Sequence, residues 1–77
     1  MYDKEKYEKS LNHKDCYYRK GLNDEDTLSI SQVKNGYAIN LALGSNICDY
    51  ATASSLEEAF DKAEKIYRNY KKWILKK

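Results

Sequence analysis

Apolar residues recur every three or four positions along residues 55–76, the spacing that places side chains on one face of an α-helix. The apolar positions are Leu56, Ala59, Phe60, Ala63, Ile66, Tyr67, Tyr70, Trp73 and Ile74. Ser55, followed three residues later by Glu58, has the form of a capping box, in which each side chain satisfies a backbone N–H of the other. On the polar side, acids precede bases by four positions in the pairs Glu58–Lys62, Asp61–Lys65 and Glu64–Arg68. The pattern therefore predicts one long amphipathic helix, because such pairs stabilise helices.

Between residues 27 and 52 the pattern changes to alternation, the period of a β-strand with one buried face. Asn35-Gly36 separates two alternating runs and favours a type I′ hairpin turn. A turn at these two residues pairs Leu28 with Leu43, Ile30 with Leu41 and Gln32 with Ile39 on one face, and Ser29 with Ala42, Ser31 with Asn40 and Val33 with Ala38 on the other. Gly44-Ser45 favours a second turn, which places Cys48 opposite Leu41 and Tyr50 opposite Ile39 in a third strand at residues 47–52.

The predicted fold class is therefore α+β: a three-stranded antiparallel meander packed against one long C-terminal helix. The sheet residues of the predicted core are Leu28, Ile30, Ile39, Leu41, Leu43, Cys48 and Tyr50, and the helix residues are Leu56, Phe60, Ala63, Ile66, Tyr67 and Tyr70. The opposite, outward face of the meander carries small and nearly uncharged residues: Ser29, Ser31, Val33, Ala38, Asn40, Ala42, Ile47, Asp49 and Ala51.

Seventy-seven residues predict a single domain, with residues 1–26 as an N-terminal segment, 27–52 as the meander and 55–76 as the helix. Residues 3–12 favour a short helix, with Tyr7 and Leu11 at helical spacing. Residues 16–19 favour an edge strand and residues 21–26 a loop. We expect this segment to fold over the outward face of the meander, because Tyr17, Tyr18 and Leu22 need burial. The alternative is that this face is free for a partner.

The charge balance favours neither a strong polyanion-binding protein nor an acidic nucleic-acid mimic, because fourteen basic and twelve acidic residues give a net charge of +2. The charges are unevenly placed, however. After Glu64 every charged residue is basic: Lys65, Arg68, Lys71, Lys72, Lys76 and Lys77. The N-terminus shows no apolar run of signal-peptide length and no segment approaches the about 20 apolar residues of a membrane span, so we expect a cytoplasmic protein without membrane contact.

Residues capable of catalysis or metal binding do not form a recognisable pattern. His13, Cys16 and Cys48 fall one ligand short of the four of a structural zinc site, and we expect both cysteines to be reduced. The carboxylates at residues 24–26 and 57–58 match neither a calcium loop nor an acid–base pair. The sequence therefore predicts a protein that is not an enzyme and that needs no metal or cofactor.

The order strand, strand, strand, helix resembles the AP2-like domain, which is also seen as the arm-binding domain of phage-type integrases. The residues that carry the resemblance are Tyr37, Ile39, Leu41, Gly44, Ser55, Glu57, Glu58 and Ala59. The resemblance implies a sheet face that reads the DNA major groove with arginines and lysines. Here that face carries Ala38, Asn40, Ala42 and Asp49. The same ending is similar to the β-β-β-α part of HicB-type antitoxins. A double-stranded-RNA-binding domain shares the order αβββα, but its helix begins with basic residues.

Small size and a composition rich in Tyr, Lys and Asn resemble phage or mobile-element accessory proteins, among them many anti-CRISPR proteins. This resemblance implies a non-enzymatic inhibitor that binds a host protein or ribonucleoprotein of a nucleic-acid-processing or defence complex. The alternative function is an AP2-like nucleic-acid-binding module or a small antitoxin-type regulator. A homodimer through an unpaired strand edge at residues 27–33 or 47–52 is a further alternative.

The end of the helix is the predicted contact site, because a helix of roughly 30 Å overhangs strands of about 23 Å. Aromatic residues flanked by bases are typical of contact hot spots. The predicted partner-binding residues are Arg68, Tyr70, Lys71, Lys72, Trp73 and Lys76, with Asn40 and Asp49 on the outward sheet face. The competing interpretation is that the N-terminal segment covers Trp73 through Tyr2, Tyr7 and Leu11.

Overall fold

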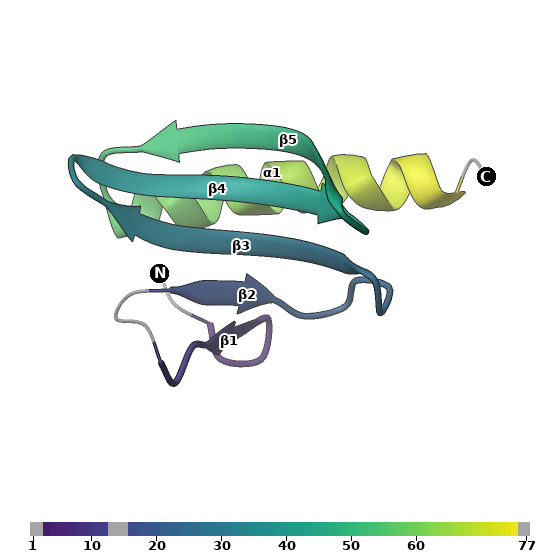
Figure 1. The fold of residues 1–77 in the computed structure, drawn as a ribbon, viewed down its shortest axis with the longest axis horizontal. Helices are drawn as coiled ribbons and strands as arrows, with labels where there is room; N and C mark the ends of the chain where they lie inside the picture. The colour runs from purple at the N-terminus through teal and green to yellow at the C-terminus, as the bar shows by residue number, and fades with distance from the viewer. Residues whose placement is uncertain (1–2, 13–15, 76–77) are drawn as a thin grey trace.

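A computed structural model describes residues 3–12 and 16–75 of the chain. These residues form a five-stranded antiparallel sheet with one helix packed across one face (Figure 1). The elements are β1 (Tyr7–Lys9), β2 (Tyr17–Arg19), β3 (Asp26–Val33), β4 (Gly36–Leu43), β5 (Asn46–Ala53) and α1 (Leu56–Leu75). The strands lie in the sheet in the order in which they occur along the chain. The predicted α+β class is confirmed, but the sheet has five strands and not three.

The strands of the N-terminal segment extend the sheet beside β3 and do not lie across its outer face, where of the described residues Cys16 contacts Ser31. In place of the predicted short helix, β1 pairs with β2, and β2 pairs with β3 through Tyr17 opposite Ile30. Tyr7 and Tyr17 are buried on the face that meets α1, where both rings pack edge-on against Phe60 at centroid distances of 4.8 and 5.2 Å. The helix prediction is wrong because strand pairing buries Tyr7, which a short helix with two apolar positions could not do. The predicted strand at residues 16–19 is confirmed as β2, but it is not an edge strand, because it lies between β1 and β3 and β1 forms the edge.

The β3–β4 hairpin forms two residues out of the predicted register. Val33 pairs with Gly36, so the turn consists of Lys34 and Asn35, and Leu28 lies opposite Leu41. A shift of two residues leaves every side chain on its predicted face, because side chains alternate with a period of two. Gly36 opens β4 with φ of 148°, and a Cβ there would lie 2.3 Å from the carbonyl oxygen of Ala53. The glycine is therefore needed for the close approach of β5.

The β4–β5 hairpin contains a bulge, and this bulge overturns the predicted faces of β5. Ala42 pairs with Ile47 but Leu41 pairs with Asp49, which leaves Cys48 as an extra residue. One inserted residue reverses the face of every side chain beyond it. Cys48 and Tyr50, which we predicted in the core, are exposed, whereas Ala51 and Ala53 face the helix side. Asp49 and Ala51 were wrongly assigned to the outward face for the same reason.

The core lies between α1 and the sheet and includes aromatic residues from the N-terminal strands. Its buried members are Tyr7, Tyr17, Leu28, Ile30, Ile39, Leu41, Ala53, Ala59, Phe60, Ala63, Ile66 and Tyr70. The helix begins as predicted after Ser55, whose Oγ accepts a hydrogen bond from the Glu58 N–H at 3.2 Å. The Glu58 carboxylate accepts a hydrogen bond from the Ser54 N–H at 3.0 Å, whereas the capping box predicted the N–H of Ser55 as the donor. The predicted ion pair between Glu58 and Lys62 forms at 3.3 Å.

The C-terminal turns of α1 extend past the ends of β4 and β5, as the difference in length predicted (Figure 1). No helix within the described residues combines the length and the apolar composition required to cross a membrane.

Candidate binding surfaces

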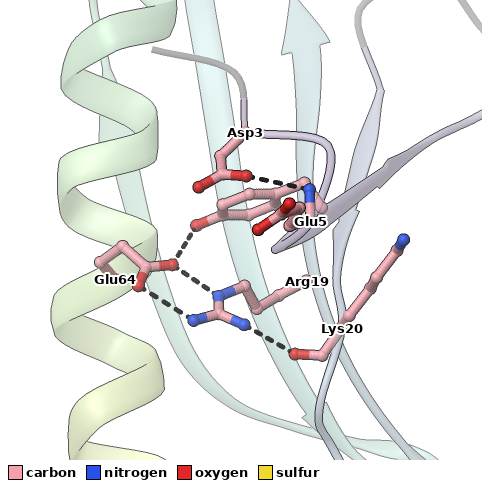
Figure 2. Close-up of polar contacts among 6 residues, drawn as sticks. Asp3, Glu5, Arg19, Lys20 and Glu64 are labelled. Atoms are coloured by element: carbon pink, nitrogen blue, oxygen red, sulfur yellow. Dashed lines mark hydrogen bonds and ion pairs between the residues drawn. The ribbon is translucent and has the colours of Figure 1, made fainter.

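A partly buried ion pair joins the N-terminal strands to the middle of α1 (Figure 2). Arg19 donates to the Glu64 carboxylate twice, from Nε at 2.6 Å and from Nη2 at 3.1 Å, and the Tyr7 hydroxyl donates to the same carboxylate at 2.6 Å. The guanidinium carbon also lies 3.8 Å from the ring centroid of Tyr67. Glu64, which we predicted to pair with Arg68 on the helix surface, thus forms a structural contact that the sequence analysis missed.

The electrostatics of this cluster follow from its partial burial. Burial raises the pKa of Glu64, but the hydrogen bonds from Arg19 and Tyr7 and the charge of Arg19 more than offset it, so the pKa is lowered overall. Burial and the bond to Glu64 raise the pKa of the Tyr7 hydroxyl, which stays protonated and keeps donating. Tyr17 and Arg19 occupy alternate positions of β2 and share a face. That alternation was the available signal that Arg19 points toward the helix.

A groove of about 290 Å³ lies between the C-terminal half of α1 and the adjoining parts of β4 and β5. We call it the helix-end groove. It is lined by Leu41, Leu43, Cys48, Asp49, Ile66, Asn69, Tyr70 and Trp73. The Trp73 side chain is 46% exposed. Most of the lining is apolar, with Asp49 and Asn69 as its polar members.

Tyr70 is a structural member of the groove lining. Its side chain is buried, its hydroxyl donates to Asp26 Oδ2 at 2.7 Å, and the same hydroxyl accepts from the Asn23 N–H at 3.0 Å. Burial and the bond to Asp26 raise the pKa of Tyr70, although the bond from Asn23 acts in the opposite direction. Tyr70 therefore fixes the loop before β3 against the helix and leaves Trp73 as the accessible aromatic side chain of the groove.

The structure distributes the predicted contact residues over different surfaces. Trp73, Tyr70 and Asp49 meet in the helix-end groove. Arg68, Lys71 and Lys72 are exposed, and Lys71 Nζ lies 5.7 Å from the ring centroid of Tyr67, on the side of the helix that meets Arg19. Asn40 is half-buried on the opposite side of the sheet from the helix. Lys76 lies outside the described residues.

The competing interpretation, in which the N-terminal segment covers Trp73, is wrong for the part of that segment which the structure describes. Tyr7 packs on Phe60 and bonds to Glu64, and Leu11 is fully exposed. In Figure 1, β1 lies beside β2, at the opposite edge of the sheet from β5 and the groove. Tyr2 lies outside the described residues.

The side of the sheet away from α1 forms a second surface, which we call the outer sheet face. Its residues on β2 to β5 are Tyr18, Thr27, Ser29, Ser31, Val33, Ala38, Asn40, Ala42, Ile47, Tyr50 and Thr52. None of them is charged, although Glu8 on β1 borders the face beside Tyr18. Tyr18, Val33, Ile47 and Tyr50 are exposed. The outer sheet face is thus uncharged and partly apolar, and it is buried at Ala38 and half-buried at Ser31, which contacts Cys16.

The two cysteines lie on different surfaces, and both are free thiols. Cys16 is buried with its Sγ 3.6 Å from Ser31 Oγ, and Cys48 is exposed in the bulge of β5. Within residues 3–12 and 16–75, no group of three or more His, Cys, Asp or Glu side chains is placed to hold a metal ion. His13, the third candidate ligand, lies outside the described residues.

Comparison with known proteins gives no relative from which a function could be transferred. No protein-family model matches the sequence, and neither a curated protein nor a solved structure matches the chain.

Proposed function

We propose that this protein is a non-enzymatic binding protein that occupies a surface of a host macromolecule, as phage-encoded inhibitors of the anti-CRISPR kind do. The observation that carries the proposal is the helix-end groove, where the partly exposed indole of Trp73 stands beside an apolar lining. Tryptophan is enriched in contact hot spots, and hot spots centre on aromatic side chains that lose water when the partner docks. The host partner is a protein or ribonucleoprotein of a nucleic-acid-processing or defence complex.

The shape and chemistry of the groove favour a protein partner. A volume of about 290 Å³ accommodates one or two side chains, which suits an anchor residue of a partner. Asp49 and Asn69 supply polar groups at the margin of the apolar lining. A hydrophobic centre with a polar rim is the usual anatomy of a protein interface.

A pull-down with matched variants tests the proposal. Tagged wild-type protein is incubated with a bacterial host lysate, beside Trp73→Ala, a triple variant with Arg68, Lys71 and Lys72 changed to Ala, and Leu11→Ala as a control at a fully exposed position. We expect a stoichiometric partner on the wild type, the triple variant and the control, and its loss from Trp73→Ala. A partner that Trp73→Ala retains would rule out the groove, and the absence of any partner would contradict the proposal.

The alternative function, nucleic-acid binding, is favoured by the exposed bases Arg68, Lys71 and Lys72 near the end of α1. The outer sheet face offers no base for the readout that the AP2-like resemblance implies, so phosphate contacts would fall on the helix. Counterion release then predicts a gel shift at low salt that weakens steeply as salt rises, and that the triple variant loses. Under the preferred proposal, neither DNA nor RNA is shifted.

A further inference from the structure

We infer that the helix-end groove takes an arginine side chain of its protein partner, which pairs with the Asp49 carboxylate and lies against the indole of Trp73. This inference rests on the proposed function, because it specifies the anchor residue that the host protein inserts. It also goes further than the proposed function, which an apolar anchor residue would serve equally well.

The first observation is the position of a carboxylate in an otherwise apolar groove. Asp49 lies opposite Leu41 of β4, and the side chains of directly paired residues share a face, so Asp49 stands on the helix side of the sheet. Both residues line the groove, together with Leu43 and Ile66. The carboxylate loses water when the groove is filled, so the occupant must supply a partner for it.

The bonds that Asp49 already forms leave capacity for such a partner. Its Oδ1 accepts a hydrogen bond from the Tyr50 N–H at 2.8 Å. No ion pair within residues 3–12 and 16–75 involves Asp49. An ionised carboxylate has about four acceptor positions, so those that remain can receive the forked N–H groups of a guanidinium.

The second observation is the aromatic side chain that lines the same groove. Trp73 is 46% exposed and belongs to the groove lining with Asp49. A cation within about 6 Å of a ring centroid is attracted to the ring face, and tryptophan gives the strongest contact of this kind. Tyr70 is buried, and its hydroxyl is bonded to the loop before β3. Trp73 therefore supplies the aromatic wall for a cation.

The bases near the end of α1 do not oppose a cation in the groove. Successive residues of an α-helix are rotated by about 100°, so the helix residues of the groove lining share one side, and Arg68, Lys71 and Lys72 project more than about 100° away from its centre. In agreement, Lys71 Nζ lies 5.7 Å from the ring centroid of Tyr67, which is not part of the lining. Of the described residues that line the groove, only Asp49 is charged, and its sign favours a cation.

Arginine fits these contacts better than lysine or an apolar residue. Its planar guanidinium stacks on an aromatic face while its N–H groups bind a carboxylate, and its apolar stem lies along apolar walls. Lysine carries a compact, strongly hydrated charge that cannot stack in this way. An apolar residue would leave the carboxylate without a partner. A nucleic-acid phosphate would meet the carboxylate with a charge of the same sign.

Titration of the full chain with three fragments tests the inference. Phenylguanidinium carries the planar cation, phenylurea is its neutral counterpart of the same shape, and benzylammonium carries a compact cation. Each is added up to about 20 mM at constant ionic strength, because fragments of this size bind weakly. The indole N–H resonance of Trp73 reports binding in NMR spectra, since the chain has one tryptophan. We expect phenylguanidinium to bind at least about 5-fold more tightly than the other two.

Asp49→Asn tests whether the carboxylate is responsible for this preference. The amide keeps the shape and can still accept from the Tyr50 N–H, so the preference should fall to about 2-fold or less. Asp61→Asn makes the same change at an exposed position in the first half of α1 and is the matched control, which should keep the preference.

Three results of the titration would overturn the inference. The first is an indole resonance that none of the fragments moves. The second is a dissociation constant for phenylurea or benzylammonium equal to that for phenylguanidinium, which would assign an apolar residue or a lysine as the anchor. The third is a preference for phenylguanidinium that Asp49→Asn retains.

The pull-down separates this inference from the proposed function. We expect the host partner to bind Asp61→Asn as it binds the wild type, and to bind Asp49→Asn at least about 10-fold more weakly. A partner that Trp73→Ala loses but Asp49→Asn retains would overturn the inference and leave the proposed function standing. A partner that both variants retain would contradict both.

Discussion

Glu64 shows how a single side chain connects segments that are distant in the sequence. Its carboxylate joins α1 to β1 through Tyr7 and to β2 through Arg19. Local spacing predicted a surface pair with Arg68, because sequence periodicity compares only positions within a few residues. The partners of Glu64 depend on where the N-terminal strands lie in the sheet, and no local pattern contains that information.

The first prediction concerns the pH dependence of this contact. The pKa of Glu64 is lowered in the folded state, so the ionised carboxylate stabilises the fold above the unfolded value of about 4.3. This stabilisation is lost as the pH falls through the lower, folded pKa. At about pH 7, Glu64→Gln should lower the free energy of unfolding by about 1–3 kcal/mol. At about pH 2 the deficit should shrink, because the wild-type carboxyl is then also neutral.

Urea unfolding of wild type and Glu64→Gln at both pH values measures the difference. Glu57→Gln serves as the matched control, since Glu57 is an exposed acid of the same helix. A deficit of equal size at both pH values would show that shape and not charge is responsible for the effect of the substitution.

The elements themselves were largely predictable, whereas the register between them was not. Alternation and helical periodicity located β3, β4 and α1, because each buries one face of a regular element, and the turn signal at Gly44-Ser45 located β5. The bulge at Cys48 leaves no mark in that pattern, since the run from residue 46 to 53 alternates poorly in either frame. The same bulge moved Asp49 into the groove. The sequence therefore predicted the aromatic residues of the candidate site, Trp73 and Tyr70. It did not predict that Asp49 lies on the helix side of the sheet and lines the same groove.

The second prediction compares the two hairpin glycines. Gly36 has φ of 148° and a Cβ there would meet the Ala53 carbonyl oxygen at 2.3 Å, whereas Gly44 has φ of 65° with no atom within 4 Å. Gly44→Ala should cost about 1 kcal/mol from backbone strain alone, and Gly36→Ala about 2–4 kcal/mol because a steric clash is added. Thermal unfolding of both variants, with Lys34→Ala as a control in the same turn, provides the comparison. Equal losses for the two glycines would argue against the close approach of β5.

The third prediction concerns the packing of α1 on the sheet. Phe60 is buried and contacts the rings of Tyr7 and Tyr17, so Phe60→Ala removes a side chain that both N-terminal strands use. The expected loss is about 3–5 kcal/mol, which is comparable to the whole stability of a small domain. Circular dichroism should show a largely unfolded variant, while Trp73→Ala melts close to the wild type. A cooperative melt of Phe60→Ala within a few degrees of the wild type would contradict this account of the core.

At the scale of the whole molecule, the N-terminal hairpin contributes to the same core as the meander and helix. The meander and α1 form a recognisable β-β-β-α unit, and their alternation made them predictable as a fold by themselves. Yet Tyr7 and Tyr17 belong to the core, and Arg19 pairs with Glu64 across the layers. A chain of this size buries only about 60% of its surface, so losing two buried aromatic residues removes a large share of the core.

The fourth prediction follows from this dependence. A variant that lacks residues 1–20 keeps β3, β4, β5 and α1, but it exposes Phe60 and the edge of β3 that pairs with β2. We expect it to lose cooperative thermal unfolding and to bind a hydrophobic dye, as compact states without fixed packing do. A synthetic peptide of residues 1–21, added in excess, should restore the cooperative transition, because it supplies Tyr7, Tyr17 and Arg19 in trans. The same peptide with Arg19 changed to Ala is the matched control and should restore less. A truncated chain that melts cooperatively near the wild-type temperature without the peptide would show that the β-β-β-α unit is the independent domain and that the N-terminal hairpin is an addition to it.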